Sequence, residues 1–207
     1  MQALFGLTNN VCGSVRLEGK DARFSAPREA IAAGLAYVPE DRQQHGAHLN
    51  QPIQHNITLP ILSRFGFFTR NRAESAVARR FAEQLELKAH HLQQHVAELS
   101  GGNQQKVVLG KWLATDPKVI ILDEPTKGID IGSKAAVHRF ISELVKRGLS
   151  VILVSSELPE VLGLADRVVV MRQGRVVREF ARQDATPETV VAAASGVDLD
   201  APTEVAA

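Results

Sequence analysis

The chain has 207 residues, a formal net charge of +1, 44% hydrophobic residues and 23% charged residues, a composition typical of one ordinary globular domain with room for a sub-domain. The near-neutral charge gives no support for nucleic-acid binding, which depends on concentrated Lys and Arg, and the one cysteine, Cys12, excludes an intramolecular disulfide. No apolar run reaches the roughly 18–20 residues of a membrane span and no signal peptide is visible, so we expect a cytosolic protein.

The first 49 residues contain two predicted strands and one predicted helix. Residues 15–18 form the first strand, which Gly19 closes. Residues 27–33 form a helix that ends at Gly34, a residue suited to that position. Residues 35–38 are an apolar strand before Pro39.

The character of the sequence changes between residues 50 and 95. In residues 71–87, Val77, Phe81 and Leu85 recur every four positions, which predicts one apolar face of an amphipathic helix. Arginines and Glu83 fall elsewhere on this helix, as on a solvated surface. We interpret this block as an inserted helical sub-domain.

Strands and helices then alternate to the end of the patterned sequence. The predicted elements are a helix at 104–114, a strand at 118–122, a helix at 134–147, a strand at 151–154, a helix at 159–164, and a hairpin of 168–171 with 175–180. After Gly196 the tail is acidic and unpatterned, so we expect disorder there. The alternation predicts an α/β fold with a mostly parallel sheet flanked by helices.

The first chemical signal is the segment 119–125, Val-Ile-Ile-Leu-Asp-Glu-Pro. Two adjacent carboxylates at the carboxyl end of a buried strand are costly unless they meet a positive charge, and magnesium bound to phosphates is such a charge. Asp123 would hold Mg²⁺, and Glu124 would orient or deprotonate an attacking water. The alternative is that Asp-Glu-Pro only ends a strand and begins a turn.

The second signal is the segment 99–106, Leu-Ser-Gly-Gly-Asn-Gln-Gln-Lys, placed before the next predicted helix. Gly101 and Gly102 would let backbone N–H groups approach an anion closely, and Ser100 adds a hydroxyl donor. The helix N-terminus behind them adds partial positive charge. The alternative is an ordinary Ser N-cap beside a flexible loop.

In this order the two segments resemble the ABC ATPase family, and the resemblance runs from Leu4 to about Phe180. It implies an LSGGQ-type loop that contacts the γ-phosphate of ATP in trans through Ser100, Gly101, Gly102, Asn103 and Gln104. It also implies a Q-loop that contains Glu40, a D-loop that contains Asp130, and an H-loop that contains Ser156. The implied fold is P-loop NTPase-like, with core parts at 1–49 and 101–182, a helical sub-domain at 50–100 and a partly disordered extension at 183–207.

The sequence departs from the family pattern at the nucleotide site. The phosphate loop G-x-x-x-x-G-K-[ST] is nowhere in it, and residues 1–7 resemble the end of the helix that normally follows that loop. We therefore expect the first strand, the loop and the adenine-stacking aromatic residue to lie upstream. Glu40 replaces the usual Gln, adding negative charge near phosphate. Ser156 replaces the usual His, which would donate to the γ-phosphate.

These departures, with YVPEDR, LSGGNQQK, LDEPTKGID and SSELPEVLGLADR, resemble the second half of the fused ATPases of monosaccharide importers. The resemblance implies a head-to-tail ATPase partner (the N-terminal half or another ABC domain), a membrane permease, and indirectly a periplasmic sugar-binding protein. It implies ATP and Mg²⁺ as cofactors and a place on the inner face of the cell membrane. This half would close its partner's ATP site, so Gly102→Asp should abolish transport and Glu124→Gln should matter less.

Other readings remain open. The chain could be a non-catalytic module, which on its own would bind ATP weakly or not at all. A soluble ABC protein of DNA repair or chromosome structure would carry heptads between Glu40 and Ser100, which are not seen. A translation-factor type would carry a basic linker, and the net charge gives that no help.

Several side chains outside the motifs invite a function. His90, His91 and His95 lack acidic or cysteine neighbours, so we expect solvated histidines rather than a zinc site. Trp112 is expected in the core. An aromatic patch at 65–68 suits permease docking. The basic residues of the sub-domain form either a solvated face or a contact for an acidic permease loop: Arg64, Arg70, Arg72, Arg79 and Arg80.

Overall fold

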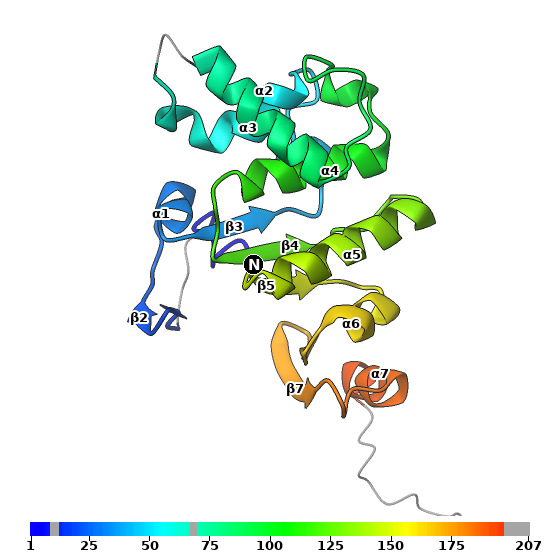
Figure 1. The fold of residues 1–207 in the computed structure, drawn as a ribbon. Coiled ribbons are helices and arrows are strands. Elements are labelled where there is room, and N and C mark those ends of the chain that lie inside the picture. The colour runs from blue at the N-terminus through cyan, green and yellow to red at the C-terminus, as the bar shows by residue number, and fades with distance from the viewer. Residues whose placement is uncertain (9–12, 67–69, 197–207) are drawn as a thin grey trace, which may run out of the picture. The chain divides into compact units, whose positions relative to one another are not determined.

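The computed structural model describes residues 1–8, 13–66 and 70–196 (Figure 1). The chain folds as two compact units, Met1–Val154 and Ser155–Ala207. Cys12, Phe67, Phe68 and the expected disordered tail lie outside the described residues. Within the described ranges no helix is both long and apolar enough to cross a membrane.

A parallel sheet forms the centre of the first unit. Its order is β3 (Leu35–Val38), β4 (Val119–Asp123) and β5 (Ser150–Val154), and Ile121 of β4 pairs with Tyr37 on one side and Ile152 on the other. All four residues of β3 are buried, as are the three central residues of β4. The predicted parallel sheet of apolar strands is therefore confirmed.

Helices pack on this sheet and complete the core. α1 (Pro27–Ala32) and α4 (Gly101–Leu113) contact β3, and α5 (Ile131–Lys146) contacts β5. One core cluster gathers Phe5, Ala30, Leu35, Tyr37 and Ile121. Trp112 is partly buried and packs edge-on against the Phe5 ring with centroids 5.3 Å apart, so it lies at the edge of the core in which it was predicted.

The predicted first strand is reduced to a small hairpin. β1 (Arg16–Leu17) pairs antiparallel with β2 (Lys20–Asp21). Glu18 and Gly19 turn the chain with φ of 51° and 76°, so the strand predicted to reach residue 18 stops where the left-handed turn begins.

The helical part contains η1 (Arg42–Gly46), α2 (Ile53–Thr58), η2 (Leu59–Arg64), α3 (Arg70–Gln84), η3 (Val96–Glu98) and the start of α4. In Figure 1, α2 and α3 lie together on one side of the sheet. Phe81 and Leu85 are buried, whereas Arg79 and Arg80 are exposed, as the amphipathic pattern predicts. The helix ends at Gln84 instead of residue 87 because Glu86 adopts a left-handed φ of 49°.

Gln54 is the polar centre of the α2–α3 contact and is 1% exposed. Its amide nitrogen donates to Asn71 Oδ1 at 3.1 Å. Its amide oxygen accepts from Ser75 Oγ at 2.7 Å and from Gln93 Nε2 at 3.0 Å. This side chain therefore joins α2, α3 and the chain that follows them.

The second unit consists of α6 (Leu158–Leu164), β6 (Arg167–Arg172), β7 (Arg175–Ala181) and α7 (Pro187–Ser195). The predicted hairpin is confirmed, with Gln173 and Gly174 at positive φ in the turn. Helix α7 was not predicted from the sequence. Thr186 is its N-cap and forms a capping box with Thr189, and Val190 packs the helix on Val168, Val170 and Phe180.

Candidate functional site

Asp123 and Glu124 stand at the carboxyl end of β4, where ligands bind in open parallel sheets. The hydroxyl of Tyr37, on the neighbouring strand β3, donates to Asp123 Oδ2 at 2.9 Å. Burial, followed by the bond to this carboxylate, raises the pKa of Tyr37 to about 12. Tyr37 therefore stays protonated at neutral pH and orients the aspartate.

Glu124 leaves the strand in a left-handed conformation with φ of 47°. Its backbone N–H still donates to the carbonyl of Val154 at 2.8 Å, so the end of β5 holds the strained turn in place. Such backbone strain in a residue other than glycine costs on the order of 1 kcal/mol or more and is concentrated at functional sites. The side chain of Glu124 is partly exposed.

The donor set at this strand end suits Mg²⁺ only in company with phosphate oxygens. Asp123 offers one carboxylate, and Mg²⁺ commonly binds one or two carboxylates together with substrate phosphates and water. Across 1–8, 13–66 and 70–196 no group of three His, Cys, Asp or Glu side chains is arranged to hold a metal by itself. His90, His91 and His95 are each exposed.

The LSGG segment lies in the first turn of α4 and does not precede the helix as predicted. Ser100 is the N-cap, and Gly101 and Gly102 are the first helical residues. The side chain of Ser100 accepts no backbone hydrogen bond of the helix, so the first N–H groups of α4 lack the usual side-chain cap. The helix dipole adds positive charge at the same point.

Asn103 controls the direction of the Ser100 hydroxyl. The backbone N–H of Lys88 donates to Asn103 Oδ1 at 3.0 Å, and Asn103 Nδ2 donates to Ser100 Oγ at 3.0 Å. Because the Lys88 N–H can only donate, the amide oxygen must face it, and the amide nitrogen must face Ser100. Ser100 Oγ is thus used as an acceptor, and its own hydrogen points away from Asn103.

Gly101 and Gly102 are required by packing inside this chain. A Cβ on Gly102 would lie 2.3 Å from Ser133 Oγ and 2.7 Å from Ser133 Cβ, which is too close. A Cβ on Gly101 would lie 2.9 Å from Arg42 Nη2 and 3.3 Å from the carbonyl oxygen of Gly128. The glycines therefore let α4 approach the start of α5 and the turn that precedes it.

Gln104 faces inward from the same helix turn. It is 6% exposed, and its amide nitrogen donates to the carbonyls of Val96 and Leu99 at 3.3 and 3.2 Å. These bonds hold the 96–99 turn against α4. The buried side chain of Gln104 thus supports the LSGG segment from the interior of the chain.

Asp130, which the sequence predicted to lie in a D-loop, caps α5. Its side chain accepts from Ser133 N at 2.9 Å and from Ser133 Oγ at 2.7 Å. The Ser133 hydroxyl, and then its backbone N–H, lower the pKa of Asp130, so this carboxylate is charged at neutral pH. The helix begins at Ile131, earlier than the predicted residue 134, because Asp130 caps it there.

Glu40 is paired with a cation that the sequence did not suggest. Lys127 Nζ lies 2.5 Å from Glu40 Oε1, and both side chains are exposed. Glu40 raises the pKa of Lys127 through this hydrogen bond and through its charge. The negative charge expected at the Q-loop is therefore offset locally.

Ser156 belongs to the second unit, and it is exposed. Its neighbour Ser155 donates to Glu160 Oε2 at 2.5 Å and accepts from the backbone N–H of Glu157 at 3.0 Å. These bonds organise the turn before α6. The first unit brings together the other site residues at the ends of β3 and β4 and the starts of α4 and α5.

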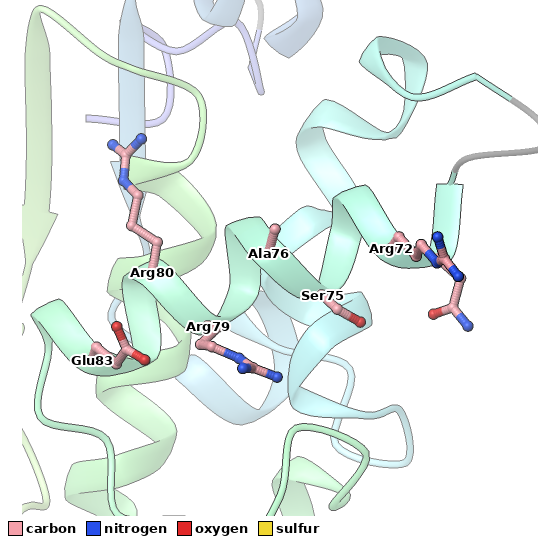
Figure 2. A pocket seen from close by; sticks show the side chains of 7 residues that line it. Arg72, Ser75, Ala76, Arg79, Arg80 and Glu83 are labelled. Carbon is pink, nitrogen blue, oxygen red and sulfur yellow. The ribbon is translucent and has the colours of Figure 1, made fainter.

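A hollow of about 480 Å³ lies along α3 and is lined by residues of that helix. Figure 2 shows Arg79 and Arg80 leaving this helix on opposite sides. Glu83 is its one acidic lining residue, and the lining is otherwise basic, neutral polar or small: Asn71, Arg72, Ser75, Ala76, Arg79 and Arg80. The hollow is therefore suited to an anionic or hydrogen-bonding surface.

The sheet, the carboxylates at the end of β4 and the LSGG segment at the start of α4 define a cassette of the ABC type. Residues 1–127 match the ABC transporter family model, and the chain belongs to that family. The fold is also that of solved ABC cassettes: a nucleotide-free ATP-binding cassette is 22% identical, with a TM-score of 0.75 over 93% of this chain and 80% of that one. A cassette in its ADP conformation gives the same TM-score and identity over 94% and 81%.

Curated relatives narrow the comparison to sugar import. The chain is 56% identical to the ribose import ATP-binding protein RbsA of Jannaschia sp. (strain CCS1), over 95% of this chain and 39% of that protein. It is 57% identical to RbsA 2 of Rhizobium johnstonii, over 94% and 38%, and 50% identical to RbsA of Rhodococcus jostii, over 97% and 40%. The chain thus spans about two fifths of the length of these relatives.

Sequence reasoning missed three partners of the site: Tyr37 for Asp123, Lys127 for Glu40, and Ser133 for Asp130. The first two lie inside motifs that were quoted for other reasons, YVPEDR and LDEPTKGID. Ser133 stands three residues after Asp130, the spacing of an N-cap bond. That spacing was a usable signal.

Proposed function

We propose that this chain is one half of the ATP-hydrolysing subunit of a carbohydrate importer, and that its LSGG segment closes the ATP site of a partner half. The observation that carries the proposal is the network Lys88–Asn103–Ser100, which leaves a hydroxyl hydrogen to donate outward beside uncapped helix N–H groups. Such donors stabilise charge that develops on a transferring phosphoryl group. Relatives named for ribose import support a monosaccharide cargo.

In the partner's site, Ser100 and the first N–H groups of α4 would donate to the γ-phosphate. Asp130 would mark the surface that meets the partner, because it is exposed and held rigid as the cap of α5. Gln104 would support this segment through its bonds to Val96 and Leu99. The donors are fixed before the nucleotide arrives, so little reorganisation accompanies the reaction.

In the chain's own site, Asp123 would be the carboxylate ligand, and Glu124 would orient the attacking water or accept its proton. Bound Mg²⁺ and ATP supply the phosphoryl group and the charge that neutralises it. Tyr37 would hold Asp123 in one orientation through its 2.9 Å bond. Lys127 would keep the charge of Glu40 paired near this site.

This own site is incomplete without further chain. The sequence contains no phosphate loop, and among the described strands only β4 pairs with β5. Ile152, at the middle of β5, stays 37% exposed. A strand that carries a phosphate loop could add to this edge, from an upstream segment or from a partner chain.

The basic hollow on α3 is our candidate surface for the permease. Arg72 and Arg79 line it, and an acidic or hydroxyl-rich cytoplasmic segment of a membrane protein would complement them. The ATPase would then be held on the inner face of the cell membrane by its permease. The predicted aromatic patch could contribute only through Phe65 and Gly66 among the described residues.

The test uses Ser100→Ala in the intact importer, because Gly102→Asp no longer discriminates. Any side chain at Gly102 would clash with Ser133 inside the chain. Loss of transport in Gly102→Asp would therefore follow either from this clash or from a lost contact with the partner's nucleotide. Ser100→Ala removes one outward donor and should lower kcat for ATP about 100-fold. Glu124→Gln should lower it less, and equal losses would contradict the proposed division of labour.

A non-catalytic module is the second candidate, favoured by the missing phosphate loop. The isolated chain should bind ATP weakly or not at all under either reading. Micromolar binding with turnover by the isolated chain would contradict both.

A further inference from the structure

Arg42 connects three segments that lie far apart in the sequence. Its Nη1 donates to the carbonyl of Lys127 at 2.7 Å, and its Nη2 donates to the carbonyl of Gly128 at 3.0 Å. The same Nη2 lies 2.9 Å from the position that a Cβ on Gly101 would occupy. One guanidinium thus touches the turn before Asp130 and fits beneath the first residue of α4.

Hydrogen bonds also hold the backbone beside Arg42, at the base of its side chain. Asp41 caps η1 by accepting from the backbone N–H groups of Gln43 and Gln44 at 2.9 Å each, which fixes the backbone around Arg42. The Glu40–Lys127 pair joins the same two segments beside it. Arg42 Nε is buried without a hydrogen-bond partner. The hydrogen bonds of the guanidinium therefore run from Nη1 and Nη2 to the two carbonyls.

We propose that Arg42 is a positioning residue that makes the LSGG segment and the D-loop move as one body with the η1 turn. This inference rests on the proposed function, because it matters only if Ser100 serves a partner's nucleotide. In this role Arg42 acts through its contacts inside the chain and needs no contact with the nucleotide. It acts by fixing where Gly101, and with it Ser100, stands relative to Gly128 and Asp130.

Arginine is suited to this role in a way that lysine is not. The two carbonyls belong to successive residues, Lys127 and Gly128, and a planar guanidinium reaches both with two parallel N–H groups. A lysine ammonium would reach one carbonyl and leave the other without its donor. The glycine at 101 then provides the space that the guanidinium occupies.

The experiment compares Arg42→Ala, Arg42→Lys, Ser100→Ala and Arg42→Ala/Ser100→Ala in the intact importer with its permease. Arg147→Ala is the matched control, because it removes an exposed arginine at the opposite end of α5. The readouts are kcat for ATP and the Kd for ADP. ADP lacks the γ-phosphate that Ser100 would contact, so its binding reports whether the nucleotide site is intact.

The inference predicts that Arg42→Ala lowers kcat about tenfold to hundredfold, as a misplaced donor does, with the Kd for ADP unchanged. Arg42→Lys should recover part of the loss. The double variant should lose no more than Ser100→Ala alone, because both changes disable the same donor. Arg147→Ala should match the wild type.

The inference is overturned if Arg42→Ala matches Arg147→Ala, if it weakens ADP binding in parallel with kcat, or if the two losses multiply in the double variant. Wild-type kcat in Ser100→Ala would overturn the proposed function and this inference together. If Arg42→Ala does not fold, Arg42→Lys replaces it in the same comparison and is judged by the same criteria.

Discussion

The hydroxyl of Tyr37 donates to Oδ2 of Asp123 at 2.9 Å and joins the ends of two neighbouring parallel strands. Eighty-six positions separate these residues in the chain. The bond ties the end of β3 to the carboxylate proposed to hold Mg²⁺. Tyr37 is the one tyrosine of the chain, so its titration can be measured without a signal from another tyrosine.

Titration of the tyrosinate absorbance should show a pKa of about 12 in the folded chain, above the ordinary value near 10. Because the folded pKa is raised, the stabilisation is complete below pH 10 and is lost as the pH rises from about 10 toward 12. Asp123→Asn should lower the titration midpoint, but burial should keep it above 10. A titration midpoint at 10 in the wild-type chain, shown to be folded by circular dichroism, would refute the contact between Tyr37 and Asp123.

Gly102→Ala should destabilise the chain by about 1–3 kcal/mol, since the new Cβ would clash with Ser133. Urea unfolding of Gly102→Ala, Ser133→Gly and the double variant measures the coupling. Ser133→Gly removes the opposing Cβ and should rescue Gly102→Ala. Ser133→Ala is the matched control that keeps this Cβ, and rescue by it would show that only the hydroxyl was in the way.

Asn103→Asp should lower the ATPase kcat of the intact importer more than Asn103→Ala does. An aspartate can still accept from the Lys88 N–H. The amide nitrogen of Asn103 donates to Ser100 Oγ, whereas the second oxygen of an aspartate would accept the hydrogen of the Ser100 hydroxyl. The Ser100 hydroxyl would then turn away from the phosphate. We expect Asn103→Asp to reach the loss of Ser100→Ala, about 100-fold. A smaller loss in Asn103→Asp than in Asn103→Ala would contradict this hydroxyl orientation.

Gln54→Leu should lower the free energy of unfolding by about 2–3 kcal/mol, because it removes the hydrogen bonds to Asn71, Ser75 and Gln93. Ser75→Ala removes one of these bonds and should cost about 1 kcal/mol. Urea denaturation at neutral pH compares the two. Equal effects would mean that Gln54 is not the centre of the α2–α3 contact.

Arg72→Glu/Arg79→Glu should reduce the amount of permease that co-purifies with the intact ATPase, by reversing the charge of the α3 hollow. Arg16→Glu/Lys20→Glu, on the exposed β1–β2 hairpin, reverses the same number of charges and should leave permease recovery unchanged. The effect should weaken in high salt, as expected for exposed charges. Equal permease recovery from all three proteins would exclude this face as the docking surface.

The elements that the sequence predicted well are those governed by local pattern. The apolar strands at Leu35–Val38 and Val119–Asp123 and the Gln173–Gly174 hairpin needed only residue type and spacing. The family motifs also located Asp123 and Ser100. Helix α7 was missed because its stability comes from Val190 packing on Phe180 and Val168, which no short-range pattern reveals.

By itself, the sequence determined the α/β fold and the strand end that carries the carboxylates, and its motif located the glycine pair, because these follow from periodicity and motif spacing; the structure moved that pair from the loop into the first turn of α4. Only the tertiary structure decided what those residues touch. Parallel pairing of β3 with β4 brings Tyr37 to Asp123, and close approach of α4 to α5 makes Gly102 face Ser133. Such contacts join residues that chain order keeps apart, and they depend on how the sheet and helices pack.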